Sequence, residues 1–205
     1  MLEAENLECM RGDRSLFRHL SFSLQPGALL QLTGPNGSGK TSLLRMISGL
    51  LQPAQGQIRW QGNNIRSLGD EYHASLTYVG HRNGLKEELS SIENLRIAAG
   101  LTGVAVTREE CRNVLGAMGL GDRDNLPVRL LSEGQKRRAA LARLMICGTA
   151  LWLLDEVFTA LDKSAVAVVR NLIEEHLGSG GIAIIATHQE LDIRAGSFQR
   201  LELAS

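Results

Sequence analysis

The stretch "GPNGSGKTS", residues 34–42, decides the fold of this chain. It fits the pattern G-x-x-x-x-G-K-[ST] and lies between an apolar run, "ALLQLT", and a run with leucines at helical spacing, "KTSLLRMISGLL". Its glycines keep side chains away, so that successive backbone N–H groups point into one concavity that can bind phosphate oxygens. The helix that follows adds the positive end of its dipole. The stretch therefore predicts a phosphate-binding loop, whereas the alternative is a glycine-rich turn that merely ends in Lys-Thr.

The loop predicts ATP and Mg²⁺ as cofactors. Lys40 can reach the β- and γ-phosphates, and the hydroxyl of Thr41 can ligate the metal. The predicted nucleotide-binding residues of the loop are Gly34, Pro35, Asn36, Gly37, Ser38, Gly39, Lys40, Thr41 and Ser42.

A second apolar run, "ALWLLDEVF" at 150–158, ends in two carboxylates. Asp155 is placed to hold the metal through water, and Glu156 is placed to polarise an attacking water. On its own, a strand that ends in a polar turn is common. Downstream of a phosphate-binding loop, with helices between, it predicts an ATPase with Thr41 and Asp155 at the metal and Glu156 as a catalytic residue.

Helical and strand patterns alternate along the chain. Short strand patterns fill the first part, three helical patterns that open on Ser or Thr fill about 90–147, and strand patterns then return. Strands that alternate with helices indicate an α/β fold with a mainly parallel sheet. We expect one domain over 1–205, with a core of 1–80 and 150–205 and a helical insert at about 90–147.

Composition excludes several classes of protein. Lys+Arg and Asp+Glu are both 22 among 205 residues, and proteins that grip nucleic acid usually carry a basic excess, so no nucleic-acid partner is expected. The three cysteines have neither disulfide-framework nor zinc-site spacing, which fits reduced thiols. No apolar run approaches the ~20 residues of a membrane-spanning helix, and the N-terminus lacks the pattern of a signal peptide.

A third motif, "LLSEGQKRRAALARL" at 130–144, begins where a loop becomes a helix. Free N–H groups and the helix dipole at such a point can bind an anion. Taken alone, the motif is better explained as an ordinary capped helix with a basic outer face.

Together these motifs resemble the ATP-binding cassette (ABC) ATPases over essentially the whole chain. "GPNGSGKT" is similar to their Walker A motif, "LSEGQ" to their signature, "LWLLDE" to their Walker B, "TALD" to their D-loop, and His188 in "IIATHQ" to their switch histidine. The resemblance implies an α/β P-loop NTPase of the ABC nucleotide-binding type, with a mainly parallel core sheet, an antiparallel β subdomain and an inserted helical subdomain. It also implies a dimer, expected to be a homodimer, in which two subunits sandwich two ATP molecules. Each signature motif would then serve the partner's ATP through Ser132, Gly134 and Gln135.

Two residues keep alternative interpretations. His188 is either a hydrogen-bonded strand end or, as the resemblance implies, a catalytic residue that contacts the γ-phosphate. Asp162 in "TALD" is either the cap of the next helix or a contact across the dimer.

Three positions depart from the family's pattern. No aromatic residue is available to stack on adenine in the loop between the first two strands, where Arg11 is the candidate substitute, since guanidinium can also stack on a purine. Val157 stands where the family usually has Pro after the Walker B glutamate, with a modest expected effect on Glu156. His81 stands where the family usually has Gln. By resemblance it would contact Mg²⁺ or the attacking water and signal to the membrane subunits, which adds it to the predicted catalytic residues.

The stretch "YVGHRNGLKEELSSIENL", together with the closing "FTALD" and "ATHQ", resembles the cassette ATPases of the cytochrome c biogenesis (haem exporter) system. That group implies a peripheral subunit at the cytoplasmic face of the inner membrane, with integral membrane subunits docking near residues 81–100. Haem would be involved only indirectly.

Three other functions stay open. One is the ATPase of another small-substrate transporter, which would share every core motif. A second is an ABC ATPase that acts on DNA or ribosomes, which the neutral charge and the single compact cassette disfavour. A third is a degenerate cassette with a structural role, which the intact Lys40, Glu156, His188 and signature motif disfavour.

Overall fold

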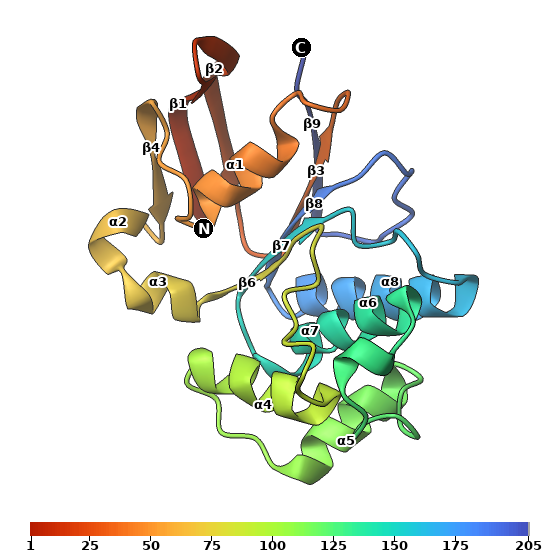
Figure 1. Cartoon of the computed structure of the whole chain (residues 1–205). Coiled ribbons are helices and arrows are strands. Elements are labelled where there is room, and N and C mark those ends of the chain that lie inside the picture. Colours follow the sequence, from red (N-terminus) through yellow and green to blue (C-terminus); the bar gives the residue numbers. More distant parts are fainter. Residues whose placement is uncertain (205) are drawn as a thin grey trace.

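The computed structural model describes residues 1–204 and contains a parallel and an antiparallel sheet (Figure 1). The parallel sheet has five strands in the order β6-β7-β8-β3-β9. These are β3 (Ala28–Thr33), β6 (Leu76–Val79), β7 (Leu151–Asp155), β8 (Ile182–Ala186) and β9 (Ser197–Glu202). Every pairing in this sheet is parallel, so the predicted α/β class with a mainly parallel core sheet is confirmed.

The antiparallel sheet is built from the N-terminal third of the chain. Its order is β2-β1-β4-β5, with β1 (Leu2–Arg11), β2 (Arg14–Leu24), β4 (Gln55–Trp60) and β5 (Asn63–Asn64). Along β1, buried Leu2 and Ala4 alternate with more exposed residues, as a strand with one face on a core requires. This sheet is the antiparallel β subdomain that the family resemblance predicted.

The parallel sheet separates two hydrophobic cores because successive side chains of each strand point to opposite faces. In β7, Leu151 and Leu153 belong to the core shared with the antiparallel sheet and α1 (Lys40–Ile47). Trp152 and Leu154 of the same strand belong to the other core, which α8 (Lys163–Gly178) covers. Both faces are covered, which explains why β7 and β8 read as continuous apolar runs.

The helices of the middle segment pack on the α8 side. They are α4 (Ser91–Leu101), α5 (Arg108–Ala117), the 3₁₀ turn η1 (Val128–Leu130), α6 (Glu133–Leu141) and α7 (Arg143–Ile146). Figure 1 shows α4 and α5, in green, at the opposite end of the molecule from the red antiparallel strands. Their apolar residues join the core of that face, so the helical insert is built onto the parallel sheet.

Capping residues begin the three longer helices of this segment, as their opening Ser and Thr predicted. Each has a capping box, formed by Ser90 with Glu93, by Thr107 with Glu110, and by Ser132 with Gln135.

Several boundaries differ from the sequence prediction. The helix expected over 40–51 ends at Ile47, because Gly49 adopts a positive φ of 79° and Leu50 is 69% exposed. The helix expected over 132–147 divides at Ala142 into α6 and α7. There the Arg143 side chain bonds the carbonyl of Ala140, which would otherwise serve the helical ladder. The prediction missed α2 (Ile65–Leu68), α3 (Asp70–Ala74) and β9, which are short or lack a clear apolar period.

Within residues 1–204, none of the helices combines the length and apolar character needed to cross a membrane.

Candidate functional site

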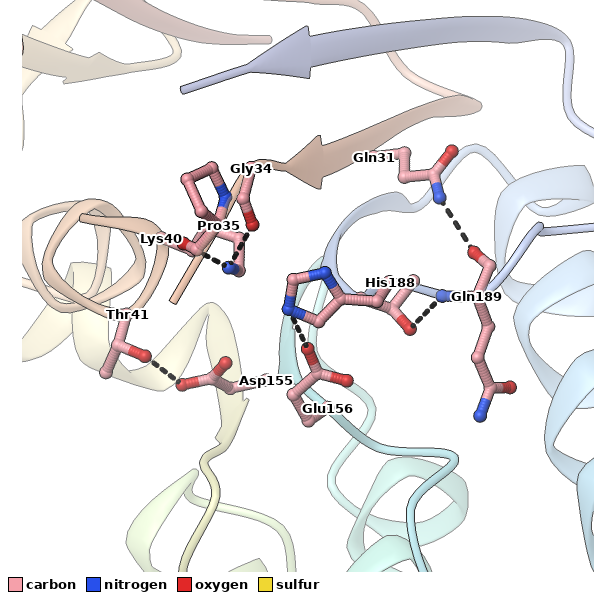
Figure 2. Close-up of polar contacts among 10 residues, drawn as sticks. Gln31, Gly34, Pro35, Lys40, Thr41, Asp155, Glu156, His188 and Gln189 are labelled. Carbon is pink, nitrogen blue, oxygen red and sulfur yellow. Dashed lines mark hydrogen bonds and ion pairs between the residues drawn. The ribbon is translucent and has the colours of Figure 1, made fainter. Parts of the chain in front are cut away.

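A cavity of about 310 Å³ brings together residues from five separate parts of the chain. It lies at the carboxyl ends of β3 and β7, the edge of an α/β sheet where ligands usually bind. Its lining comprises Arg11, Leu16, Asn36, Gly37, Gly39, Lys40, Thr41, Ser42, His81, Asp155 and Glu156. Most of the predicted loop residues thus meet Arg11, His81, Asp155 and Glu156 at one place. The predicted residues outside the lining are Gly34, Pro35, Ser38, Ser132, Gly134, Gln135 and His188. Figure 2 shows the polar contacts beside the cavity.

Two glycines shape the loop between β3 and α1. Gly34 has a φ of 133°, and a Cβ there would come within 2.3 Å of the carbonyl oxygen of Leu203. Gly39 has a φ of 105°, and a Cβ there would meet the ring of Phe17 at 3.1 Å. Gly39 is also the N-cap of α1, which has no side-chain hydrogen bond at this end. The first N–H groups of α1 are therefore available to an anion.

Lys40 arches back across this loop. Its ammonium Nζ donates to the carbonyl oxygens of Gly34 at 2.7 Å and Pro35 at 3.1 Å, as drawn in Figure 2. The residue is only 8% exposed, and both acceptors are neutral, so neither balances the charge of this largely buried cation. A phosphate in the loop would supply the missing negative charge.

Ser38 provides an independent test of whether the loop fits a phosphate. Its hydroxyl Oγ is buried without a hydrogen-bond partner, which native structures rarely leave unexplained. The loop therefore holds a buried polar group and a buried cation that a polyanionic ligand would satisfy.

Thr41 and Asp155 fit a magnesium site. The Thr41 hydroxyl donates to Oδ2 of Asp155 at 2.8 Å, across 114 residues of sequence. Both provide hard oxygen ligands, which Mg²⁺ prefers. Within residues 1–204 no group of three or more His, Cys, Asp or Glu side chains is placed to hold a metal.

Glu156 follows directly after β7 and lies beside His188. Its Oε1 is 3.7 Å from Nε2 of His188, and its side chain is one-quarter exposed (Figure 2). The backbone of Glu156 has a φ of 51°, a left-handed conformation that costs a non-glycine residue about 1–3 kcal/mol. Such strain persists only where neighbouring contacts hold it. The N–H of Glu156 donates to the carbonyl of Ala186 at 2.9 Å, which is one of these contacts.

A side chain of β3 holds the loop that carries His188. The side chain of Gln31, only 1% exposed, donates from Nε2 to the carbonyl of Gln189 at 2.9 Å. The N–H of Gln189 in turn donates to Oγ1 of Thr187 at 3.2 Å. Figure 2 shows the bond between Gln31 and Gln189 next to His188. His188 itself is half-exposed and lies beyond the end of β8, so the structure places it beside the carboxylate rather than within a strand.

Arg11 and His81 are exposed residues of the cavity wall. Arg11 ends β1, and His81 follows shortly after β6. Leu16 of β2 lines the same wall and offers an apolar surface that the sequence reasoning missed. The stacking role of Arg11 and the sensing role of His81 stay predictions.

The signature residues lie outside this cavity lining. The Ser132 hydroxyl accepts from the N–H of Gln135 at 3.3 Å, and the Gln135 side chain accepts from the N–H of Ser132 at 2.9 Å. These two residues thus form the cap of α6. Gly134 lies close to the "TALD" segment, since a Cβ there would be 3.0 Å from the carbonyl of Ala160. A role for this segment at a partner's nucleotide stays a prediction.

Asp162 caps α8. Its Oδ1 accepts from the N–H of Ala165 at 2.8 Å, and this bond and one from Ser164 lower the pKa of the carboxyl. The capping interpretation therefore holds within one subunit, and the contact across a dimer stays a prediction.

Arg137 and Gln31 are site residues that sequence reasoning missed. Both hold backbone carbonyls beside Glu156 and His188 rather than facing the cavity. Arg137 stands two residues after the signature motif, in a run read as the basic outer face of a helix, yet it is only 4% exposed.

Comparison with known proteins independently identifies the family that the sequence motifs predicted. The model of the family "ABC transporter" matches residues 17–159. The chain belongs to the ABC transporter family. The "Cytochrome c biogenesis ATP-binding export protein CcmA" of Nitrosospira multiformis is 54% identical over 202 residues, covering 98% of both chains. The protein of the same name from Dechloromonas aromatica is 50% identical and covers 99% of this chain and 100% of its own. The predicted family is confirmed.

Solved structures agree on the fold. The ATP-binding protein of a putative ABC transporter from Pyrococcus furiosus superimposes with a TM-score of 0.84 at 27% identity, covering 98% of this cassette and 96% of that chain. The ATP-binding cassette MJ0796, solved as a dimer in a post-hydrolysis state with ADP and Pi, gives a TM-score of 0.81 at 22% identity, with 92% and 88% covered. The predicted ABC nucleotide-binding fold is confirmed.

Proposed function

We propose that this chain is the Mg²⁺-dependent ATP-hydrolysing subunit of an export complex that serves cytochrome c biogenesis. The observation that carries the hydrolytic part is the meeting, at one cavity, of a phosphate-binding loop, the Thr41–Asp155 pair and Glu156. His188 lies outside the lining, 3.7 Å from the Glu156 carboxylate. Family membership and the names of relatives at 54% and 50% identity support the same assignment.

Each residue has a separate task in hydrolysis. Lys40 and the open N-terminus of α1 bind the β- and γ-phosphates. Thr41 and Asp155 hold Mg²⁺, directly or through water, and bound Mg²⁺ neutralises charge on the phosphate oxygens. Glu156 accepts a hydrogen bond from the attacking water and orients it. His188, beside that carboxylate, donates a hydrogen bond to the γ-phosphate.

We assign the second half of the site to another subunit, most simply a second copy of this chain. The cavity is open on one side, and Ser132, Gly134 and Gln135 lie outside its lining. In a dimer of the family type, the start of α6 would cover the γ-phosphate held by the partner's loop. The N–H groups of Glu133 and Gly134, which the capping box does not use, are the donors available there.

We place the chain as a peripheral subunit at the cytoplasmic face of the inner membrane. A groove of about 540 Å³ on α4 supports docking of an integral membrane subunit near residues 81–100. Its walls are largely apolar, and the adjoining side chains of Ile97 and Leu101 are 48% and 81% exposed. Apolar surface of this kind marks interaction sites. Haem enters this proposal only through the complex.

His81 is proposed to report the nucleotide state to that surface. It lines the ATP cavity and stands only a few residues before the groove. We expect His81→Ala to lower either the ATPase rate or its stimulation by the membrane partner. An unchanged rate and an unchanged stimulation would return His81 to an ordinary loop residue.

The test has two readouts that separate the motor from its biological role. The purified chain should hydrolyse ATP with Mg²⁺ and lose the activity when EDTA removes the metal. The chain, tagged and recovered from detergent-solubilised membranes of its host, should carry cytochrome c maturation subunits with it. Hydrolysis together with subunits of another transporter would favour the second candidate, a motor for a different substrate.

A further inference from the structure

Arg137 is a buried arginine that makes no contact with the cavity. It lies in α6, is 4% exposed and points toward the end of β7. Arginine is almost never buried unless a partner compensates its charge. The acceptors of its guanidinium are therefore informative.

The guanidinium of Arg137 donates hydrogen bonds to three consecutive backbone carbonyls in the turn after β7, at residues 155–157. Nη2 donates to the carbonyl of Asp155 at 3.0 Å and to that of Glu156 at 2.9 Å, and Nε donates to that of Val157 at 3.4 Å. One side chain thus holds both sides of the residue with the left-handed backbone, whose φ is 51°.

The same guanidinium reaches the segment that carries His81. Nη1 donates to the carbonyl of Gly80 at 2.8 Å and to Oδ1 of Asn83 at 3.1 Å. Arg137 therefore connects α6 to two segments that line the nucleotide cavity, namely the turn after β7 and the loop after β6.

Arg137 is buried without a direct ion pair to a carboxylate. Burial lowers the pKa of Arg137, and the nearby carboxylates of Asp155 and Glu156 partly oppose this effect. All of its direct acceptors are neutral oxygens, which a rigid planar fork serves and a single ammonium does not. Because residue 157 is Val, no proline restricts the backbone of Glu156 from the following position, and the hydrogen bonds from Arg137 act beside that of the Glu156 N–H to Ala186 in holding the turn.

We propose that Arg137 is the positioning residue of the hydrolytic step: it holds the strained turn so that the Glu156 carboxylate stays aimed at the attacking water, and it ties this turn to the His81 loop and to α6. The proposal rests on the proposed ATPase function. It predicts an effect on turnover rather than on ATP binding, because Arg137 does not touch the phosphate-binding loop.

The test compares Arg137→Gln and Arg137→Lys in the full chain. We expect kcat to fall roughly 10–100-fold in Arg137→Gln, as misplacing a catalytic group does, with the Kd for ATP within about threefold of wild type. Arg137→Lys should fall less, since it keeps the charge but cannot bridge all the carbonyls. Arg112→Gln, which breaks an arginine contact with Asp124 in the helical insert, is the matched control and should keep the wild-type kcat.

A double-mutant cycle separates positioning from general stability. Adding Arg137→Gln to Glu156→Gln should cost no further activity, because the positioned carboxylate is already gone. A kcat within twofold of wild type in folded Arg137→Gln, an additive loss in the double variant, or a failure of both Arg137 variants to fold would overturn the proposal. A wild-type chain that does not hydrolyse ATP would instead refute the proposed function.

Discussion

Two helices of this molecule, α1 and α6, carry the two predicted nucleotide motifs at their N-termini, and the two N-termini are capped in opposite ways. At α1 the N-cap is Gly39, which has no side chain to offer, and the buried hydroxyl of Ser38 beside it has no partner. At α6 the N-cap is Ser132, whose hydroxyl and N–H are both engaged with Gln135. The first terminus has no side-chain cap and is open to an anion, whereas at the second the N–H of Gln135 is capped within its own subunit and the N–H groups of Glu133 and Gly134 are not used by the capping box.

The difference in capping explains why only the N-terminus of α1, and not that of α6, contributes to a cavity within one subunit. Lys40, Thr41, Asp155 and Glu156 converge near the open terminus and line a cavity. No residue of the capped terminus lines that cavity, and Gly134 there lies close to the carbonyl of Ala160. One half of the proposed ATP site is therefore preformed, and we propose that a second subunit supplies the other half.

The largest expected effect is on kcat and comes from substitution of Glu156, which lines the cavity at the uncapped N-terminus of α1. Glu156→Gln should lower kcat by about 10²–10⁴-fold, the usual contribution of a positioned base, because an amide cannot accept the proton of the attacking water. ATP affinity should stay within a few-fold of wild type, since phosphate binding uses other groups. Steady-state assays and equilibrium ATP binding measure the two effects, with Glu109→Gln on the exposed face of α5 as control. Turnover within a few-fold of wild type would remove Glu156 as the base.

Next is binding at the same terminus. Lys40→Ala should weaken ATP about 10–100-fold, because hydrogen bonds to charged groups contribute about 1.5–3 kcal/mol each. The measurement is equilibrium binding of a fluorescent ATP analogue, with Lys163→Ala at the exposed start of α8 as the matched control. Equal affinities for wild type and Lys40→Ala would show that the open terminus does not bind phosphate as described.

A smaller effect is expected at the capped end. Ser132→Ala should cost about 1 kcal/mol of unfolding free energy, the usual loss for an N-cap, and should slow dimer-dependent hydrolysis without changing ATP binding by the monomer.

Thr107→Ala provides the comparison, because Thr107 forms the same capping box on α5, away from the cavity. Its stability loss in chemical denaturation should match that of Ser132→Ala, while its ATPase rate should equal that of wild type. Identical ATPase rates in both variants would mean that the start of α6 has no part beyond capping its helix.

The smallest effect is expected at the base-binding wall. Arg11→Ala should weaken ATP about 2–5-fold and leave inorganic triphosphate unaffected, because an exposed stacking contact contributes about 0.5–1 kcal/mol. Arg14→Ala, across the same turn but outside the cavity lining, is the control in competitive binding assays. An unchanged preference for ATP over triphosphate would assign base contact to Leu16 instead.

The sequence predicted the parts of the site whose chemistry is local. The loop of 34–42 and the strand end at Asp155 and Glu156 carry their residues in fixed spacing, so their meeting in one cavity could be expected. The mainly parallel character of the core sheet and the capping of α4, α5 and α6 were likewise readable from the alternation of strands and helices and from opening Ser and Thr residues, whereas the strand order was not predicted.

Contacts between distant segments could not be read in this way. Arg137 occupies a basic run that looks like a solvated helix face, and only the packing of α6 against the end of β7 shows that it is buried. Gln31 lies within an apolar strand, and its role depends on a loop 158 residues further along. The end of α1 at Ile47 depended on the backbone of Gly49, which apolar spacing does not encode.

The most direct test of whether a second subunit completes the ATP site is the oligomeric state of the Glu156→Gln chain with and without Mg-ATP. Light scattering measures the oligomeric state, and the bound nucleotide is quantified in the same samples. The contrast between α1 and α6 predicts a monomer without nucleotide and a dimer that retains two ATP molecules with it. Loss of the N-cap hydroxyl of α6 in Ser132→Ala should weaken that dimer. A chain that stays monomeric with ATP bound, while the wild type hydrolyses ATP at a rate per molecule independent of protein concentration, would contradict the account.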